Sequence, residues 1–231
     1  AVDWYADRGY KQVKIYNSFP VAALPDTIAH AHRRGLKVSG HIPYGLRAEE
    51  AVRMGYDEIQ HINQVLLNFL VTPTTETRTP LRFTLPAEKL ATHDFDSAAY
   101  RDFIALLKAR RTVVDPTVVT FDFIRQRAGK LSEPFAPVAD HLPANSQRRL
   151  RQGEMEIPDD ATEQRYRASY AKMVEFIGRM ERAGIPIVPG TDGFAGFGLH
   201  AELAAYVDAG LSPARVLQIA TRLSQPWPAA S

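Results

Sequence analysis

The sequence predicts an α/β fold built on a parallel sheet, and three observations support this. Short apolar runs alternate with longer helix-like stretches along most of the 231 residues. A glycine closes several of the helix-like stretches, as at Gly35, Gly55 and Gly184. The segments between successive apolar runs are long enough for the crossovers that parallel strands require. We therefore expect consecutive βαβ units.

The predicted strands are short runs rich in Val and Ile, several of which end at polar residues. In chain order they are residues 12–16, 36–41, 56–62, 113–119 and 185–192. The predicted helices are residues 24–34, 48–54, 98–111, 164–183, 199–209 and 213–221. Residues 98–111 show the clearest periodicity, because Tyr100, Phe103 and Leu107 fall on one helix face. Pro116 is expected at the end of its strand or at a bend.

Two segments interrupt the alternation and are expected to be insertions. Residues 71–86 are rich in Thr and Pro, and residues 125–160 carry several prolines and many charges. No linker divides the chain, so we expect residues 1–231 to form one, incomplete, domain. The first residues resemble the last turns of a helix closed by Gly9, which suggests that part of the fold precedes them.

The composition excludes several classes of protein. There are 28 basic and 26 acidic residues, and the formal net charge of +2 gives no electrostatic reason to bind nucleic acid or an anionic membrane. The absence of cysteine excludes disulfides, thiolate metal sites and cysteine nucleophiles. No apolar run approaches the roughly 18 residues of a membrane span. A cytoplasmic location is expected, with a lost signal peptide as the alternative.

Polar residues cluster at the carboxyl ends of predicted strands, where βα barrels and open α/β sheets place their active sites. They are Lys14, His41, His61 and Asp192. Each has a simple structural explanation when taken alone: Lys14 could protect a sheet edge, and Asp192 could form a turn. Their convergence on one edge favours a site. Two imidazoles with carboxylate-type oxygens suit Zn²⁺, Mn²⁺ or Fe²⁺.

Taken in order, these residues and their neighbours resemble the amidohydrolase superfamily. The matching segments are residues 13–16 (VKIY), 39–43 (SGHIP), 59–61 (IQH), 189–193 (PGTDG) and 198–203 (GLHAEL). The resemblance is closest to the branch of imidazolonepropionases and Xaa-Pro dipeptidases. It covers nearly the whole chain except the two insertions. It implies a partial TIM-like (β/α) barrel, from about the fourth strand to the eighth.

The resemblance also implies an activity. A metal-dependent hydrolase of this type uses metal-activated water to cleave an amide-type C–N bond in a small substrate, such as a dipeptide or a cyclic amide. Lys14, carboxylated to a carbamate, would bind Zn²⁺ or another divalent ion together with His41, His61 and Asp192. Asp192 would also be the general acid and base. Three further residues are candidates for contact with the substrate: Tyr16, Tyr44 and His200.

One motif of that family is missing at its expected place. The resemblance implies a His-x-His pair on the first barrel strand, but the only such spacing here is His30 and His32, inside the predicted helix 24–34. Residues two apart on a helix point about 200° apart, so we expect these two histidines on the helix surface. The first three strands are therefore expected to be absent, leaving at most one tightly bound ion. A homo-oligomer would cover the open edge of the barrel.

Two alternatives stay open. The same site could belong to a C–O hydrolase, such as a lactonase or an esterase. The missing His-x-His pair also favours a catalytically inactive, truncated module that works only in an oligomer.

Overall fold

Short parallel strands follow one another in chain order, as the βαβ pattern predicts. A computed structural model describes residues 1–193 and 196–221. Strand β1 (Gln12–Ile15) pairs in parallel with β2 (Lys37–Gly40), and β3 (Glu58–Gln60) pairs in parallel with β4 (Val113–Asp115). Asp57 joins the two pairs, because its backbone N donates to Val38 O at 3.0 Å and its carboxylate accepts from Val38 N at 2.9 Å. The fold is therefore α/β.

Helices surround these strands, and most carry the signals expected from the sequence. The α-helices are α1 (Val2–Ala6), α2 (Leu24–Arg33), α3 (Ala48–Met54), α4 (Ile62–Leu66), α5 (Leu81–Lys89), α6 (Ala98–Arg110), α7 (Ala144–Arg149), α8 (Asp160–Ala183), α9 (Phe197–Asp208) and α10 (Pro213–Thr221). The 3₁₀ segments are η1 (Val21–Ala23), η2 (Leu67–Phe69), η3 (Leu90–Thr92), η4 (Val118–Arg125) and η5 (Glu133–His141).

The ends of α3 and α8 illustrate why these residues form helices. Helix α3 ends at Gly55, whose φ of 116° is a left-handed conformation that glycine adopts at little cost. Helix α8 begins after Asp159, whose carboxylate accepts from Thr162 N at 2.7 Å, and it ends at Gly184. These local signals confirm the predicted glycine stops.

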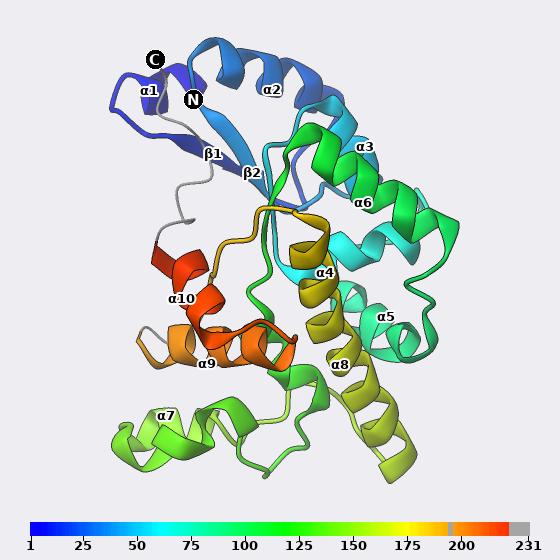
Figure 1. Cartoon of the computed structure of the whole chain (residues 1–231), viewed down its shortest axis with the longest axis vertical. Coiled ribbons are helices and arrows are strands. Elements are labelled where there is room, and N and C mark those ends of the chain that lie inside the picture. Colours follow the sequence, from blue (N-terminus) through cyan, green and yellow to red (C-terminus); the bar gives the residue numbers. More distant parts are fainter. Residues whose placement is uncertain (194–195, 222–231) are drawn as a thin grey trace.

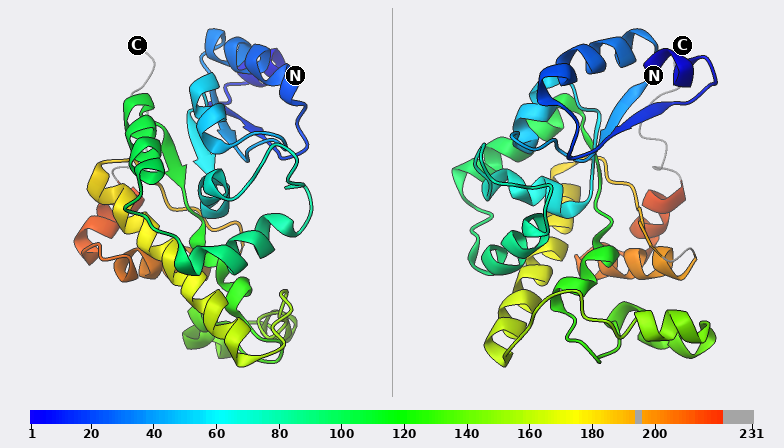
Figure 2. Two further views of the ribbon diagram at one scale, coloured as in Figure 1. Left: turned by 90° about the vertical axis from the view of Figure 1, so that its right-hand side faces the viewer. Right: turned by 180° about the vertical axis from the view of Figure 1, so that it is seen from behind.

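The long helix α8 runs from the middle of the molecule to one of its ends (Figure 1). In Figure 1, strands β1 and β2 with α1, α2 and α3 lie at one end, and α7 lies at the other. The turned views in Figure 2 show the same separation of the two ends. The main core runs through the first end and along α8, whereas Phe135, Ala139 and Leu150 of residues 125–160 form a smaller cluster with Val119 of η4. The second insertion therefore packs on apolar contacts of its own.

The sequence prediction was wrong for part of the first insertion. Residues 81–86 are not a loop but begin α5, which contains Pro86. Proline has no N–H to bond the carbonyl one turn earlier. In this helix that carbonyl, Arg82 O, accepts from the side-chain amide of Asn63 at 3.2 Å. The hydrogen bond from Asn63 thus replaces the helix bond that Pro86 cannot make, and the helix continues where the proline predicted a loop.

The last predicted strand, residues 185–192, was also predicted too long. In the described residues it is reduced to one parallel bridge between Ile187 and Val114. Pro186 and Pro189 cannot donate to a ladder, so only the bonds from Val114 N to Pro186 O and from Val188 N to Val114 O remain.

Two further strands end earlier than predicted, at Gln60 and at Asp115. The positive φ of His61 (73°) and of Thr117 (47°) turns the chain there. These elements give part of a parallel α/β sheet, and the described residues contain no closed barrel. No helix within residues 1–193 and 196–221 is long and apolar enough to cross a membrane.

Candidate functional site

The structure brings His41 and His61 into direct contact. His41 follows β2 and His61 follows β3, and their ring centroids lie 4.6 Å apart at an interplanar angle of 86°. Both side chains are buried. Adjacent parallel strands place their carboxyl ends side by side, so residues at those ends meet although the chain separates them.

The ring of His41 is held on two sides. Its Nδ1 lies 2.5 Å from the side-chain oxygen of Asn17, and Tyr16 stacks on its face at a centroid distance of 4.1 Å. A hydrogen bond from Nδ1 fixes the tautomer and leaves the lone pair on Nε2. Tyr44 supports this loop, because its backbone N donates to Asn17 O at 2.9 Å. Asn17 is thus a positioning residue that sequence reasoning missed.

His61 connects the histidine pair to Asp192. Its Nε2 lies 3.8 Å from Oδ2 of Asp192, and its backbone N donates to Asp115 O at 2.7 Å. Its Nδ1 is buried with no hydrogen-bond partner among the described residues. Asp192 has a φ of 41°, an uncommon conformation for a residue with a side chain, and its carboxylate is 61% exposed. The site therefore has a buried side formed by imidazoles and an open side formed by a carboxylate.

Burial keeps both imidazoles neutral. Desolvation, followed by the charges of its neighbours His61 and Lys14, lowers the pKa of His41 to about 3. Desolvation also lowers the pKa of His61 to about 4, although the nearby carboxylate of Asp192 opposes this shift. Neutral imidazole is the form that donates a lone pair to a metal ion.

Lys14 lies near this group but on an exposed face. It sits on β1 opposite Ser39, and its charge acts on both histidines. Its side chain is exposed to solvent. Carboxylation requires a deprotonated amine, which burial promotes. The described residues of this chain do not supply that burial.

Two acids near Lys14, the buried Glu58 and the half-buried Asp115, were not among the predicted site residues. Burial raises the pKa of Glu58 and of Asp115 to about 6, and the charge of Lys14 opposes both shifts. Asp115 accepts from the hydroxyl of Thr117 at 2.8 Å. It also packs so tightly on Gly190 that a Cβ there would lie 2.3 Å from its carboxylate oxygens. The sequence did carry a signal for Asp115, because it is a polar residue at the carboxyl end of a strand, as His41 and His61 were predicted to be.

The candidate substrate-binding residues are scattered. Tyr16 stacks on His41 and is exposed, so it belongs to the group. Tyr44 instead lies under the guanidinium of Arg78, at 4.3 Å from the ring centroid. His200 is exposed on α9, and none of the described ring contacts, ion pairs or hydrogen bonds of the histidine pair includes it.

His30 and His32 lie on the surface of α2, as predicted. Their Nε2 atoms lie 2.9 Å from Asp3 Oδ1 and 2.8 Å from Asp57 Oδ2, respectively. Each histidine therefore has its own carboxylate partner, and the two do not form one chelating pair.

The donor atoms fit a divalent ion in type. Each histidine has a ring nitrogen that could bind an ion. In His41 it is Nε2, because Nδ1 bonds Asn17, and in His61 Nδ1 has no hydrogen-bond partner among the described residues. Within the described ranges, however, no three His, Asp or Glu side chains are arranged to hold one ion. A complete ligand set would therefore need Lys14 as well as a small movement of Asp192 or of the histidines.

Comparison with known proteins gives structural matches only. No protein-family model and no curated protein matches the sequence. The structure is similar to that of a bottromycin amidohydrolase, with a TM-score of 0.67, 22% identity, and coverage of 97% of this chain and 48% of that one. It is also similar to a Xaa-Pro dipeptidase that holds methionine in its active site, with a TM-score of 0.50, 14% identity, and coverage of 95% and 45%.

These matches agree with the family resemblance of the motifs at the strand ends. The chain spans about half the length of both solved structures. At these identities, the likeness concerns the fold. The described residues therefore share their fold with about half of each of those two proteins.

Proposed function

We propose that this protein takes part in the metal-dependent hydrolysis of an amide-type C–N bond in a small substrate. The observation that carries the proposal is the pair of buried imidazoles, His41 and His61, in contact at two strand ends and beside Asp192. Imidazole nitrogens beside a carboxylate are donor types that a catalytic divalent ion takes in proteins. The names of both structural neighbours, an amidohydrolase and a dipeptidase, favour an amide-type bond over the lactone or ester alternative.

Four residues would hold a divalent ion such as Zn²⁺, Mn²⁺ or Fe²⁺: His41, His61, Lys14 and Asp192. When bound, such an ion supplies an acidified water and polarises the scissile carbonyl. The side chain of Asn17 keeps Nε2 of His41 available by occupying Nδ1. Oδ2 of Asp192 would take the proton of the attacking water and pass it to the leaving nitrogen. Its exposure leaves room for a substrate on that side.

The exposed position of Lys14 links this proposal to assembly. We propose that a second copy covers the free edge of β1, which has β2 as its only strand partner in the described residues. Covering this edge would bury Lys14 and favour loss of its proton, which carboxylation requires. Light scattering across a concentration series tests this step, and a monomer at all concentrations would contradict it.

The function is tested on protein stripped of metal and then titrated with Zn²⁺ or Mn²⁺. Calorimetry should show one tightly held equivalent, and dipeptide hydrolysis should appear only in the loaded protein. His41→Ala and Asp192→Asn should each lower kcat/KM by about 100-fold or more, and His41→Ala should also weaken Zn²⁺ binding. The control is His32→Ala, which removes a surface histidine outside the site. Two results would contradict the proposal: Zn²⁺ binding that is lost in His32→Ala but not in His41→Ala, or hydrolysis that persists without metal. Metal binding without any turnover would support the inactive module.

A further inference from the structure

A cavity opens directly beside Asp192. Its volume is about 290 Å³, and Asp192 and Gly193 form part of its wall. This volume lies at the lower end of the roughly 300–1,000 Å³ of small-molecule sites, which suits a group the size of one amino-acid side chain. The other end of the cavity is formed by η4 and by the insertion, residues 125–160.

Five apolar side chains line the cavity beside its polar residues. Three side chains are aromatic and two are aliphatic: Phe83, Phe123, Phe135, Val119 and Leu150. Two of them, Phe135 and Leu150, come from the insertion and belong to its small core. The insertion therefore supplies a fixed apolar wall to a cavity that ends at the candidate site.

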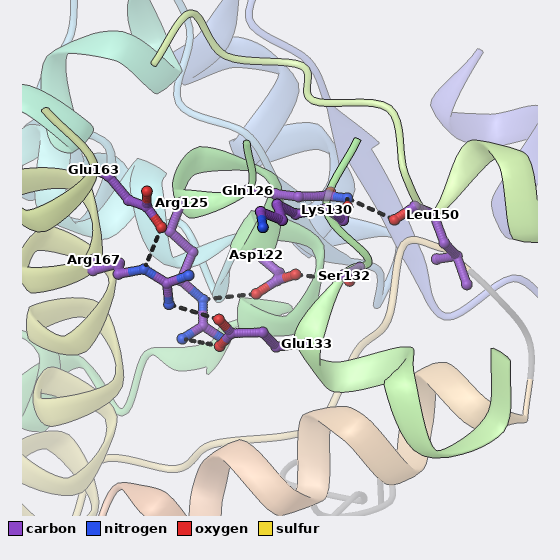
Figure 3. A network of polar contacts seen from close by, with 9 residues as sticks. All are labelled: Asp122, Arg125, Gln126, Lys130, Ser132, Glu133, Leu150, Glu163 and Arg167. Atoms are coloured by element: carbon purple, nitrogen blue, oxygen red, sulfur yellow. Dashed lines mark hydrogen bonds and ion pairs between the residues drawn. The ribbon is translucent and has the colours of Figure 1, made fainter. Parts of the chain in front are cut away.

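The buried polar groups of the wall bond to one another. Asp122 accepts from Arg125 Nε and from the hydroxyl of Ser132, both at 2.7 Å, as Figure 3 shows. The amide of Gln126 donates to Leu150 O at 2.6 Å and to Lys130 O at 2.7 Å. Because these groups already have partners, they offer little to a charged ligand.

Ion pairs tie this wall to the long helix α8. Glu133 lies 3.0 Å from Arg125 and 2.6 Å from Arg167 of α8, and Arg167 also pairs with Glu163 at 3.0 Å (Figure 3). The wall is thus anchored both to η4 and to α8. An anchored wall holds its shape before a ligand arrives, which lowers the entropic cost of binding.

We propose that this cavity is the subsite for an uncharged, apolar side chain, the size of leucine or phenylalanine, next to the scissile bond. The inference rests on the proposed function, because Asp192 is what joins the cavity to the reacting atoms. The charged residues Arg149 and Glu154 line it too, but both side chains are exposed and of opposite sign. Asp122 is already paired with Arg125 and Ser132, and Asp192 is assigned to the reacting atoms, so we assign the selectivity to the apolar side chains.

Gly198 offers a position from which the cavity can be filled. It lies on α9 and lines the cavity, and an added Cβ would approach Thr191 no closer than 3.4 Å. Gly198→Leu therefore places a branched side chain in the cavity, and Gly198→Ala adds a single methyl group as a graded step. The matched control is Ala204→Leu, which adds the same side chain to an exposed position of α9.

Binding is measured first on metal-free protein by saturation-transfer NMR, with N-acetyl-phenylalanine amide as the probe and N-acetyl-glutamate amide and N-acetyl-lysine amide as comparisons. The apolar probe should bind about tenfold more tightly than either charged one, and Gly198→Leu should weaken it by about tenfold. Gly198→Ala should have a smaller effect and Ala204→Leu none. Equal binding of all three probes, or tight binding to Gly198→Leu, would overturn the proposal.

Turnover then separates the two proposals. Metal-loaded protein is assayed with dipeptides that carry Phe or Glu beside the cleaved bond, and Phe should be preferred. If both are cleaved equally and Gly198→Leu changes neither rate, the subsite assignment is wrong and the hydrolase stands. If neither is cleaved although the apolar probe binds selectively, the hydrolase proposal is wrong, and with it the assignment of the cavity as a substrate subsite.

Discussion

The rings of His41 and His61 meet edge to face, with their centroids 4.6 Å apart, at the ends of two neighbouring strands. The orientation of each ring depends on the neighbouring residues. Asn17 and Tyr16 hold the first ring, and the positive φ of His61 turns the second towards it. The contact buries two titratable groups side by side, and burial lowers the pKa of both.

Replacement of Asn17 should weaken metal binding. Asn17→Ala removes the oxygen that bonds Nδ1 of His41, so the ring loses its fixed tautomer and orientation. Loss of such a partner typically lowers metal affinity by about 10–100-fold. Calorimetric titration with Zn²⁺ measures the effect. Asn68→Ala is the control, since Asn68 is also buried but accepts from Glu49 N at 2.8 Å, away from the site. Equal losses in the two variants would argue against a positioning role.

Glu202 should make the protein less stable as the pH rises. It is fully buried on α9, with one oxygen accepting from Val119 N at 2.7 Å, and burial raises its pKa from 4.5 to about 8. Between these two values the folded chain keeps a proton that the unfolded chain has lost. The free energy of unfolding therefore falls with rising pH, by up to about 1.4 kcal/mol per pH unit.

The window from about pH 7.5 to 8.5 isolates this effect, because the other groups with shifted pKa values have almost finished titrating there. The pKa values of Glu58 and Asp115 are raised only to about 6, and the unfolded histidines titrate near 6.5. Urea unfolding should show that the free energy of unfolding falls with pH in this window. Glu202→Gln should flatten this slope, because an amide does not titrate, and its oxygen can still accept from Val119 N. Glu156→Gln, at an exposed position, should leave the slope unchanged. A slope that survives in Glu202→Gln would show that another group causes it.

Gly40 should tolerate no side chain. Its φ is 119°, and a Cβ would lie 2.2 Å from Ile15 O, so the Gly40→Ala change must push β2 away from β1. The expected loss is on the order of 3 kcal/mol or more in the free energy of unfolding. Gly35→Ala is the control, because Gly35 has a φ of 72° with open space around it, and about 1 kcal/mol is expected there. Similar losses at the two positions in urea titrations would contradict the close approach of the strands.

The wall of the cavity should loosen when Ser132 is replaced. Ser132→Ala leaves one oxygen of Asp122 without its hydroxyl donor, in a buried setting. Hydrogen exchange should then accelerate by about tenfold at the amides of Gly129 and Ser132, which bond to Arg151 O and Leu150 O. Exchange in α2 should not change. Ser146→Ala, on α7 of the same insertion, serves as the control, and a global acceleration would mean that the whole fold had been weakened instead.

Local signals predicted most elements of the fold. Helices α3 and α10 have the bounds that the sequence indicated, because a glycine stop and an apolar period act within a few residues. The errors have long-range causes. Pro86 lies within a helix because Asn63, from another helix, bonds the carbonyl that it leaves free, and residues 185–192 contribute a single bridge because two prolines limit their ladder.

The order of residues along the chain was enough to place Lys14, His41 and His61 at or next to the ends of strands, since alternating strands and helices repeat one geometry. Asp192 instead lies beyond the single bridge at Ile187. Only the tertiary structure decided that the two histidines touch while Lys14 is exposed, and that Asn17 and Glu202 are buried. Burial is a property of contacts between distant segments. The same contacts shift the pKa values and enclose the cavity next to Asp192, and for that reason they determine the chemistry of the site.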